Sequence, residues 1–478
     1  MSRALAVGVL LMTGCGADKD SPGHDKSRPD IETDSDSDTD PGIDENPGNI
    51  LILLIDDVGV DKMAPYGAYD MQPSTPHIDS LAERGVLFRR AYASPICSPT
   101  RASLLTGRYT ARLGVGRTIW ESSSLQLQNN QTLLPEMLSE SRFDYTSAAV
   151  GKWHLAGLNS ATSLDHPMVN GFDSYQGTLG NIADYYSWVL NDNGAAVQTE
   201  AYATTHQIDT TIALIDSLPE PWLIYVAFNA PHKPLHVPPV DLHSDPTLTL
   251  GDGDVRLFKA VVEAVDTEVG RLFSHMEGPL LDRTTILFLG DNGTGDFAVT
   301  APFDPARSKN TVFEGGVHVP FIVAGPLVAH PGTESEAFVH VADVFHTVAD
   351  LAEVDLSVGQ LAGVATDGLS LLPYLANPDA PSAREFAFAE EFIPIGAGPY
   401  TQRSRMIRED RYKLIRVDGI DQPFREEIYE FVDGAVDEGP PLPQPYDSDQ
   451  QAAYDRLVTE LDRMDSDLVF DPRREDPL

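Results

Sequence analysis

Acidic and amide side chains follow two apolar segments of this 478-residue chain, at the points where each segment ends. Asp56 and Asp57 follow residues 49–55, and Asp291 and Asn292 follow Gly290 at the end of a second run, residues 285–289. Carboxylate and amide oxygens are ligands for hard cations, so the four side chains together predict a Ca²⁺ site, with Mg²⁺ as the second choice. Either pair alone would be better explained by a turn.

Cationic and imidazole side chains follow two other apolar runs. Lys152 and His154 come after residues 146–150, and His232 comes after residues 222–228. Such groups can neutralise an anion and transfer protons. A solvated charge or a satisfied core histidine would explain any one of them, but their recurrence after separate runs favours a shared site.

The apolar runs have the length and composition of strands buried on both faces. Helical patterns over residues 78–84 and 255–276 alternate with them. This alternation predicts an α/β fold with a large mixed, mostly parallel sheet flanked by helices. In such folds ligands bind beyond the carboxyl ends of the strands, where the polar side chains described above would lie.

Cys97 opens the segment Cys-Ser-Pro-Thr-Arg-Ala-Ser-Leu-Leu-Thr-Gly-Arg. Pro99 suits the first turn of a helix that continues through Leu105 and ends near Gly107. Cys97 is therefore expected at a helix N-terminus, where free N–H groups favour anions. A buried structural cysteine and a thiolate nucleophile are the alternatives.

The pattern Cys-x-Pro-x-Arg, followed by Ala-Ser-Leu-Leu-Thr-Gly-Arg, resembles the signature of type I, formylglycine-dependent sulfatases. This arylsulfatase-like family belongs to the alkaline-phosphatase-like superfamily, and the resemblance covers most of the chain. Further matching motifs are Asp56-Asp57 and residues 74–79, 151–155, 230–232, 291–293 and 308–316.

The resemblance implies a chemistry for Cys97. In this family a maturation enzyme recognises the motif, including Pro99 and Arg101, and oxidises the cysteine to Cα-formylglycine (3-oxoalanine). One hydroxyl of the hydrated aldehyde attacks sulfur and expels the alcohol, which leaves a covalent sulfo-enzyme intermediate. The second hydroxyl then drives sulfate out. The implied activity is that of a sulfuric ester hydrolase, a sulfatase.

The resemblance also implies a ligand set for the metal. Asp56, Asp57, Asp291, Asn292 and the modified Cys97 would hold Ca²⁺ against a sulfate oxygen. Asp291 would in addition accept the proton of the nucleophile.

The remaining roles follow the same resemblance. Arg101 would steady the diol, and Lys152 and Lys309 would neutralise sulfate oxygens. His154 would take the proton that starts sulfate elimination, and His232, with Lys309, would assist the leaving alcohol.

One departure from the family pattern concerns the surroundings of Lys309. His318 stands where the family commonly has arginine, which leaves the support around Lys309 open.

The N-terminal residues 1–15 have the pattern of an export signal. Leu-Met-Thr-Gly-Cys, ending at Cys15, resembles a bacterial lipobox and implies lipidation of Cys15 and a membrane-anchored lipoprotein in the periplasm or at the cell surface. An ordinary export signal is the alternative. Residues 16–48 contain 11 acids and 3 bases, which predicts a disordered acidic linker.

Two folded regions are expected after the linker. Residues 49–384 would form the catalytic domain. Residues 385–478 contain alternating segments at 405–408 and 411–416, which resemble the small C-terminal antiparallel sheet of sulfatases, and a helical stretch over 450–465.

The formal net charge of −40 argues against a nucleic-acid partner. A phosphodiesterase or phosphonate monoester hydrolase of the same superfamily and a non-catalytic surface lipoprotein are the alternative functions. The substrate, a sulfated small molecule or carbohydrate, stays open among aryl, carbohydrate and glycosaminoglycan sulfates. Candidate aromatic side chains for stacking on it are Trp120, Tyr185, Tyr186 and Trp188, although core packing would explain them too.

Overall fold

The computed structural model describes residues 47–432 and 435–470. The predicted signal, the lipobox Cys15 and residues 16–46 of the predicted linker lie outside the described residues. The described chain is already held at Gly48, whose carbonyl accepts a 3.0 Å hydrogen bond from the Tyr145 hydroxyl. Among the described helices, none combines the length and the apolar character that a membrane crossing requires.

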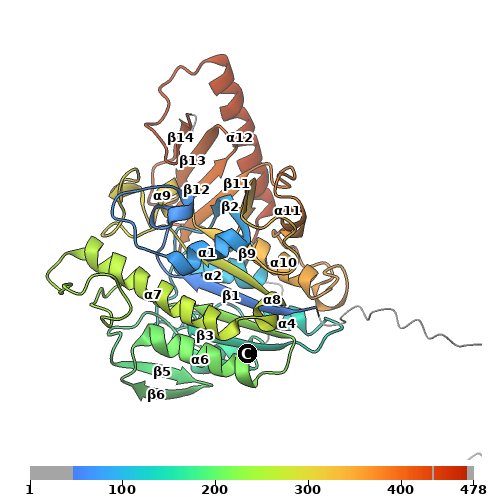
Figure 1. The fold of residues 1–478 in the computed structure, drawn as a ribbon. Coiled ribbons are helices and arrows are strands. Elements are labelled where there is room, and N and C mark those ends of the chain that lie inside the picture. Colours follow the sequence, from blue (N-terminus) through green and yellow to red (C-terminus); the bar gives the residue numbers. More distant parts are fainter. Residues whose placement is uncertain (1–46, 433–434, 471–478) are drawn as a thin grey trace, which may run out of the picture. The chain divides into compact units, whose positions relative to one another are not determined.

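A ten-stranded mixed sheet has the order β10-β2-β9-β8-β1-β7-β3-β4-β5-β6 (Figure 1). The five pairs β10–β2, β8–β1, β1–β7, β7–β3 and β3–β4 are parallel, which confirms the predicted fold class. The strands are β1 (Asn49–Ile55), β2 (Gly85–Tyr92), β3 (Thr146–Lys152), β4 (Ser174–Thr178), β5 (Trp188–Asp192), β6 (Ala195–Thr199), β7 (Trp222–Ala227), β8 (Thr284–Gly290), β9 (Phe321–Ala324) and β10 (Thr333–His340).

The central strands are buried on both faces because helices cover each side. Along β1, Ile50 and Ile52 pack into one hydrophobic cluster, and Leu51 and Leu53 pack into the other. One cluster is closed by α2 (Cys97–Thr106), α4 (Leu134–Leu138), α10 (Asp343–Leu351) and α11 (Leu372–Ala376). The other is closed by α1 (Pro76–Arg84), α6 (Ala203–Ser217), α7 (Asp254–Met276) and α8 (Pro279–Asp282). The short helices α3 (Thr110–Leu113) and α5 (His166–Val169) lie in connecting segments.

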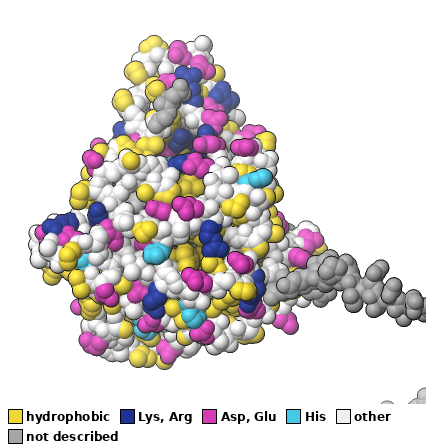
Figure 2. Space-filling view, in the orientation of Figure 1, with side chains coloured by type: hydrophobic (Ala, Val, Ile, Leu, Met, Phe, Trp, Pro, Cys, Tyr) yellow, Lys and Arg dark blue, Asp and Glu magenta, His cyan; other side chains and the backbone are white. Residues whose placement is uncertain are grey.

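The C-terminal residues form the predicted second, antiparallel sheet, with the order β11-β12-β13-β14. Its strands are β11 (Ala387–Ile393), β12 (Gln402–Arg408), β13 (Tyr412–Asp418) and β14 (Arg425–Glu430), and α12 (Ser448–Asp467) packs on one face through Leu457 and Leu461. The opposite face packs on Tyr92 and Val317 of the main body. Figure 2 shows Asp and Glu side chains spread over the face in view, while several Lys and Arg side chains gather over this sheet.

A buried ion network joins the two sheets. Glu314, the first residue of α9 (Glu314–Val317), accepts hydrogen bonds from Lys413 Nζ at 3.0 Å and from Arg408 Nη1 at 2.5 Å. Lys413 also donates to Glu438, and Glu438 Oε1 accepts a 2.9 Å bond from the Glu314 N–H. Burial opposes ionisation of Glu314, but the charges of Arg408 and Lys413 outweigh it and lower its pKa to about 2. The C-terminal sheet thereby fixes the segment that follows Lys309.

Removal of Lys413 tests this network. Lys413→Met leaves Glu314 and Glu438 buried without their shared cation, so the free energy of unfolding should fall by about 3–5 kcal/mol in urea denaturation. The exposed Arg463→Met change should cost about 1 kcal/mol or less.

The pH dependence of this difference follows from the pKa of Glu314. Its folded value of about 2 lies below the ordinary 4.5. The network therefore contributes fully above about pH 4.5 and is lost as the pH falls toward about 2. The difference between wild type and Lys413→Met should shrink over that range, and a constant difference would contradict the ion network.

Candidate active site

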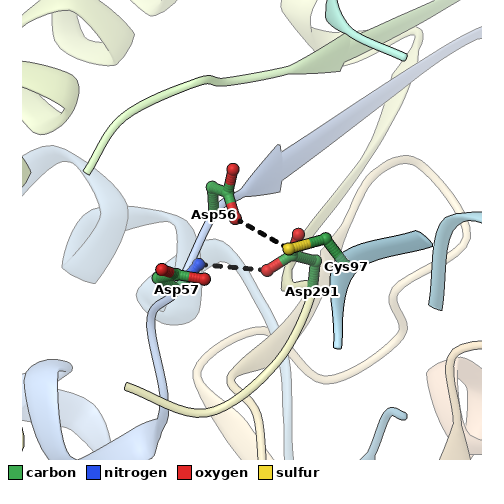
Figure 3. A group of neighbouring side chains, drawn as sticks. All are labelled: Asp56, Asp57, Cys97 and Asp291. Atoms are coloured by element: carbon green, nitrogen blue, oxygen red, sulfur yellow. Dashed lines mark hydrogen bonds between the residues drawn. The ribbon is translucent and has the colours of Figure 1, made fainter. Parts of the chain in front are cut away.

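The two acidic segments lie side by side because β1 and β8 are parallel neighbours that end together, with Ile55 opposite Gly290. The Asp57 N–H donates a 3.0 Å hydrogen bond to Asp291 Oδ1, as Figure 3 shows. Asn292 Nδ2 donates to Asp57 Oδ1 at 2.9 Å. Ligand atoms of Asp56, Asp57, Cys97 and Asp291 all lie within 4.8 Å of one another. The structure thus brings together all five side chains of the predicted metal site.

The donor set fits a hard cation. Asp56, Asp57, Asp291 and Asn292 are all buried, with at most 1% of each residue exposed. Asn292 Oδ1 is buried and has no hydrogen-bond partner in the described part of the chain. A buried acceptor without a donor is costly, and a cation among these oxygens would satisfy it.

Cys97 is the first residue of α2, as the position of Pro99 predicts, and is 2% exposed. Its Sγ donates to Asp56 Oδ1 at 3.6 Å (Figure 3), and Lys309 Nζ lies 3.5 Å from the same sulfur. Burial raises the pKa of the thiol to about 12, and the charges of Lys152 and Lys309 only partly oppose this rise. An unmodified Cys97 is therefore protonated near neutral pH, which disfavours the alternative of a thiolate nucleophile.

Each carboxylate of the site has a cationic partner. Lys152 Nζ donates to Asp56, Lys309 Nζ donates to Asp57, and Arg101 Nη2 donates to Asp291 Oδ2 at 2.8 Å. These cations are themselves buried: the side chains of Arg101 and Lys152 are 0% exposed and that of Lys309 is 11% exposed. Arg101 Nη1 also donates to the Lys152 carbonyl at 2.6 Å, which ties α2 to the end of β3. Removing any one partner would leave a buried charge uncompensated.

Both predicted histidines lie at this edge of the sheet. His154 follows β3 and is 2% exposed, and its Nδ1 has no hydrogen-bond partner among the described residues. His232 follows β7, and its Nδ1 lies 2.7 Å from the Lys233 carbonyl oxygen. Burial and the charge of Lys152 lower the pKa of His232 to about 4 and that of His154 well below 6.5. Both rings are therefore neutral near pH 7.

Three residues in or next to the site have a strained backbone. Asp57, His154 and Asn310 have positive φ angles of 59°, 61° and 70°. Such conformations cost about 1–3 kcal/mol each and are typical of functional sites. Gly293, after Asn292, is required for a different reason: a Cβ there would lie 1.9 Å from the Gly315 oxygen. That close approach places the turn after Asn292 against α9.

His318 lies apart from Lys309. Its Nε2 is 2.8 Å from the Arg89 carbonyl oxygen, and its ring stacks on Tyr92 with centroids 5.5 Å apart. His318 Nδ1 also lies 3.6 Å from Glu314 Oε2, so His318 belongs to the surroundings of Glu314. Lys309, whose support the sequence left open, is held by its N–H bond to the Thr294 carbonyl at 3.1 Å and by its pairing with Asp57.

Three supporting residues were not predicted. The Thr294 hydroxyl donates to Asp61 Oδ1 at 2.7 Å and accepts from the Gly59 N–H at 3.1 Å. Lys62 pairs with Asp61 at 2.9 Å. These contacts join the segment after Asp57 to the segment after Asn292. The only signal in the sequence is that Asp61 and Thr294 lie close to Asp57 and Asn292.

The candidate stacking residues divide into two groups. Tyr185 and Trp188 are buried, and the Tyr185 hydroxyl donates to the Asn229 and His232 carbonyls, so both belong to the core. Trp120 and Tyr186 are 64% and 38% exposed. Trp120 follows Ile119, whose N–H donates to Ser98 Oγ at 3.0 Å beside Cys97.

The family model for sulfatases matches residues 48–354. The chain belongs to the sulfatase family. It is 28% identical over 381 residues to the uncharacterized sulfatase YdeN of Escherichia coli K12, covering 69% of this chain and 66% of the relative. The human N-acetylgalactosamine-6-sulfatase is 29% identical over 367 residues, with coverages of 69% and 66%. The matches therefore span just under two thirds of these relatives.

Solved structures resemble this chain over a larger share of its length. Ps i-CgsB bound to k-i-k-neocarrahexaose has a TM-score of 0.71 at 25% identity and covers 87% of this chain and 92% of its own. The phosphonate monoester hydrolase of Agrobacterium radiobacter has a TM-score of 0.64 at 18% identity, with coverages of 88% and 96%, and shares the fold.

The protonated state of the Cys97 thiol gives a testable prediction for protein in which this residue is unmodified. Thiolate is the reactive form, so with a pKa of about 12 folded Cys97 should react with iodoacetamide at about pH 8 on the order of a thousandfold more slowly than in unfolded protein. The rate should rise about tenfold per pH unit near pH 8. Cys15→Ser leaves Cys97 as the single thiol. Fast alkylation that levels off near pH 8 would restore the thiolate alternative.

Proposed function

We propose that this protein is a sulfuric ester hydrolase that cleaves a sulfate monoester of a sulfated carbohydrate, using Cα-formylglycine at position 97 and Ca²⁺. The observation that carries the proposal is the environment of Cys97. Cys97 is the first residue of α2 and lies in the motif of the family. Its Sγ lies 3.6 Å from a carboxylate oxygen of Asp56 and 3.5 Å from the side-chain nitrogen of Lys309. The names of relatives support a sugar sulfate, among them N-acetylgalactosamine-6-sulfatase.

Asp56, Asp57, Asp291, Asn292 and residue 97 would hold the cation. Four hard oxygen donors suit Ca²⁺, which accepts irregular geometry, better than Mg²⁺, which demands a near-octahedral set. When bound, the cation would supply positive charge to the sulfate oxygens.

Formylglycine would supply, as its hydrate, a hydroxyl nucleophile at the N-terminus of α2. A formylglycine-generating enzyme is therefore a necessary partner. The high pKa of the buried thiol supports this conversion, because the unmodified side chain would be a poor nucleophile. Arg101, held by Asp291 and the Lys152 carbonyl, would orient residue 97.

Lys152 and Lys309 would bind the sulfate oxygens from two sides of residue 97. The neutral His154, with its unpartnered Nδ1, would accept the proton whose loss begins sulfate release. His232 is neutral without substrate, but a sulfate beside it would favour the protonated ring. That ring, together with Lys309, would donate a proton to the leaving alcohol.

Cys15 would carry the lipid that anchors the exported protein to a bacterial membrane, and the acidic linker would separate the enzyme from the bilayer. The alternative hydrolases of the same superfamily would use the same site on a phosphorus ester.

Release of inorganic sulfate tests the function. Protein produced with a formylglycine-generating enzyme should release sulfate from sulfated monosaccharides or from 4-methylumbelliferyl sulfate, as measured by ion chromatography. Cys97→Ala should abolish release, and Lys152→Ala should lower kcat/KM by about 10²–10³-fold, because it removes a preorganised charge. Lys259→Ala on α7 is the control and should keep full activity.

Three outcomes distinguish the candidate functions. Sulfate release that depends on Cys97 supports the proposal. Hydrolysis of phenyl phosphonate or a phosphodiester, without sulfate release from any substrate, would favour the phosphonate or phosphodiester hydrolase. An inactive protein with unmodified Cys97, despite coexpression, would favour a non-catalytic lipoprotein.

A further inference from the structure

A cavity of about 270 Å³ lies between the segment that follows Lys309 and the C-terminal sheet. One wall is formed by residues 310–313 and by Arg117. The opposite wall is formed by β11, β12 and β13 and by the segment that leads into β14. We infer that this cavity binds an anionic sugar unit adjacent to the unit that carries the sulfate ester, which makes the substrate an acidic oligosaccharide.

The near wall of the cavity is attached to both sides of Cys97. The Asn310 N–H donates to the Pro95 carbonyl at 2.9 Å, and Lys309, the preceding residue, lies 3.5 Å from Cys97 Sγ. On the other side, Ile119 donates to Ser98, and Arg117 lies two residues before Ile119. The cavity is therefore lined by segments that are tied to the residues on either side of Cys97. The inference rests on the proposed function and extends it to the rest of the substrate.

Arginines are the most frequent charged side chains in the cavity lining, although the protein is strongly acidic. Its lining contains three arginines, Arg117, Arg403 and Arg425, and one carboxylate, Glu391, in a chain with a formal charge of −40. Glu390 and Asp465 pair with Arg403, and Glu427 lies 3.7 Å from Arg425, so these acids offset part of the positive charge. Acids farther away than the screening length of about 8 Å at physiological salt count for little. The exposed guanidinium groups of Arg117 and Arg425 are therefore the groups that would bind an anion.

Two of these arginines retain donors for such a ligand. Arg425 has a side chain that is 55% exposed, with its nearest recorded acid, Glu427, at 3.7 Å. Arg117 pairs with Glu391 through Nη1 and is 37% exposed. Arg403 contacts Glu390 and Asp465 through Nη2 and its Nε is buried, so the donors open to a ligand are those of Arg117 and Arg425. Guanidinium groups bind carboxylate and sulfate oxygens through paired donors.

The uncharged lining suits a sugar ring. Side-chain amides and hydroxyls of Asn310, Thr311, Gln402 and Ser404 lie among the rings of Phe313 and Phe392. Polar groups that fix hydroxyls beside apolar faces are typical of small-molecule sites. The volume is slightly below that of pockets for drug-sized ligands, which fits one sugar unit. Its anionic group would be a uronic carboxylate or a second sulfate.

Binding to defined oligosaccharides tests the inference. Calorimetry would use full-length Cys97→Ala protein, which cannot turn over substrate, with a chondroitin 6-sulfate tetrasaccharide, a carrageenan tetrasaccharide and the corresponding sulfated monosaccharides. At least one tetrasaccharide should bind roughly tenfold more tightly than its monosaccharide. Tighter binding of the chondroitin tetrasaccharide would identify the bound anionic group as a carboxylate. Tighter binding of the carrageenan tetrasaccharide would identify it as a second sulfate. Either result supports binding of an anionic sugar unit in the cavity.

Variants of the cavity provide the decisive comparison. The double change Arg117→Ala and Arg425→Ala should remove the advantage of the tetrasaccharide. Arg463→Ala on α12, whose side chain is similarly exposed at 59%, should keep it. The inference is overturned if neither tetrasaccharide binds more tightly than its monosaccharide, or if the double variant retains the full advantage.

The same probes separate this inference from the proposed function. If the matured enzyme releases sulfate from a monosaccharide and shows no preference for the longer chain, the role of the cavity in binding is overturned and the sulfatase activity is supported. Length-dependent binding that requires Arg117 and Arg425, without sulfate release from any probe, would support the cavity and overturn the sulfatase activity.

Discussion

Three buried carboxylates and three buried cations meet around Cys97, and the fold is arranged so that none of these charges stands alone. Asp56, Asp57 and Asp291 converge at the ends of two parallel strands, where they would repel one another without compensation. Lys152, Lys309 and Arg101 supply that compensation. A buried charge without a partner costs several kcal/mol, so each element that carries one of the six must be held in place.

The supporting structure follows from this constraint. β1 and β8 deliver the acids in register, β3 delivers Lys152, and α2 delivers Arg101. Lys309 comes from an irregular segment and needs separate support. The Lys309 N–H donates to the Thr294 carbonyl, and the helix α9 that follows is anchored to the C-terminal sheet by the network of Glu314 with Lys413 and Arg408. The C-terminal sheet supplies none of the six charges itself. The same sheet forms one wall of the cavity that Arg117, Arg403 and Arg425 line.

The sequence predicted those elements whose burial requires a continuous run of apolar residues. The apolar runs that became β1, β3, β7 and β8 predicted the centre of the sheet and the edge at which the polar side chains gather. β4, β5 and β6 escaped prediction because they are short and lie toward one end of the sheet; every residue of β6 is at least partly exposed. The Asp61–Thr294 contact and the cavity were also inaccessible, because their residues are far apart in the chain and only packing brings them together.

Calcium binding tests most directly whether the charged cluster is a cation site. Isothermal titration calorimetry of chelator-treated protein should detect one Ca²⁺ per chain. Asp291→Asn should weaken binding by about a hundredfold, because it removes a charged ligand at the centre of the set. Asp282→Asn, at an acid whose side chain is 76% exposed on α8, should leave binding unchanged. Absence of binding, or equal affinity in Asp291→Asn and wild type, would contradict a cation site and leave the cluster as a purely structural set of ion pairs.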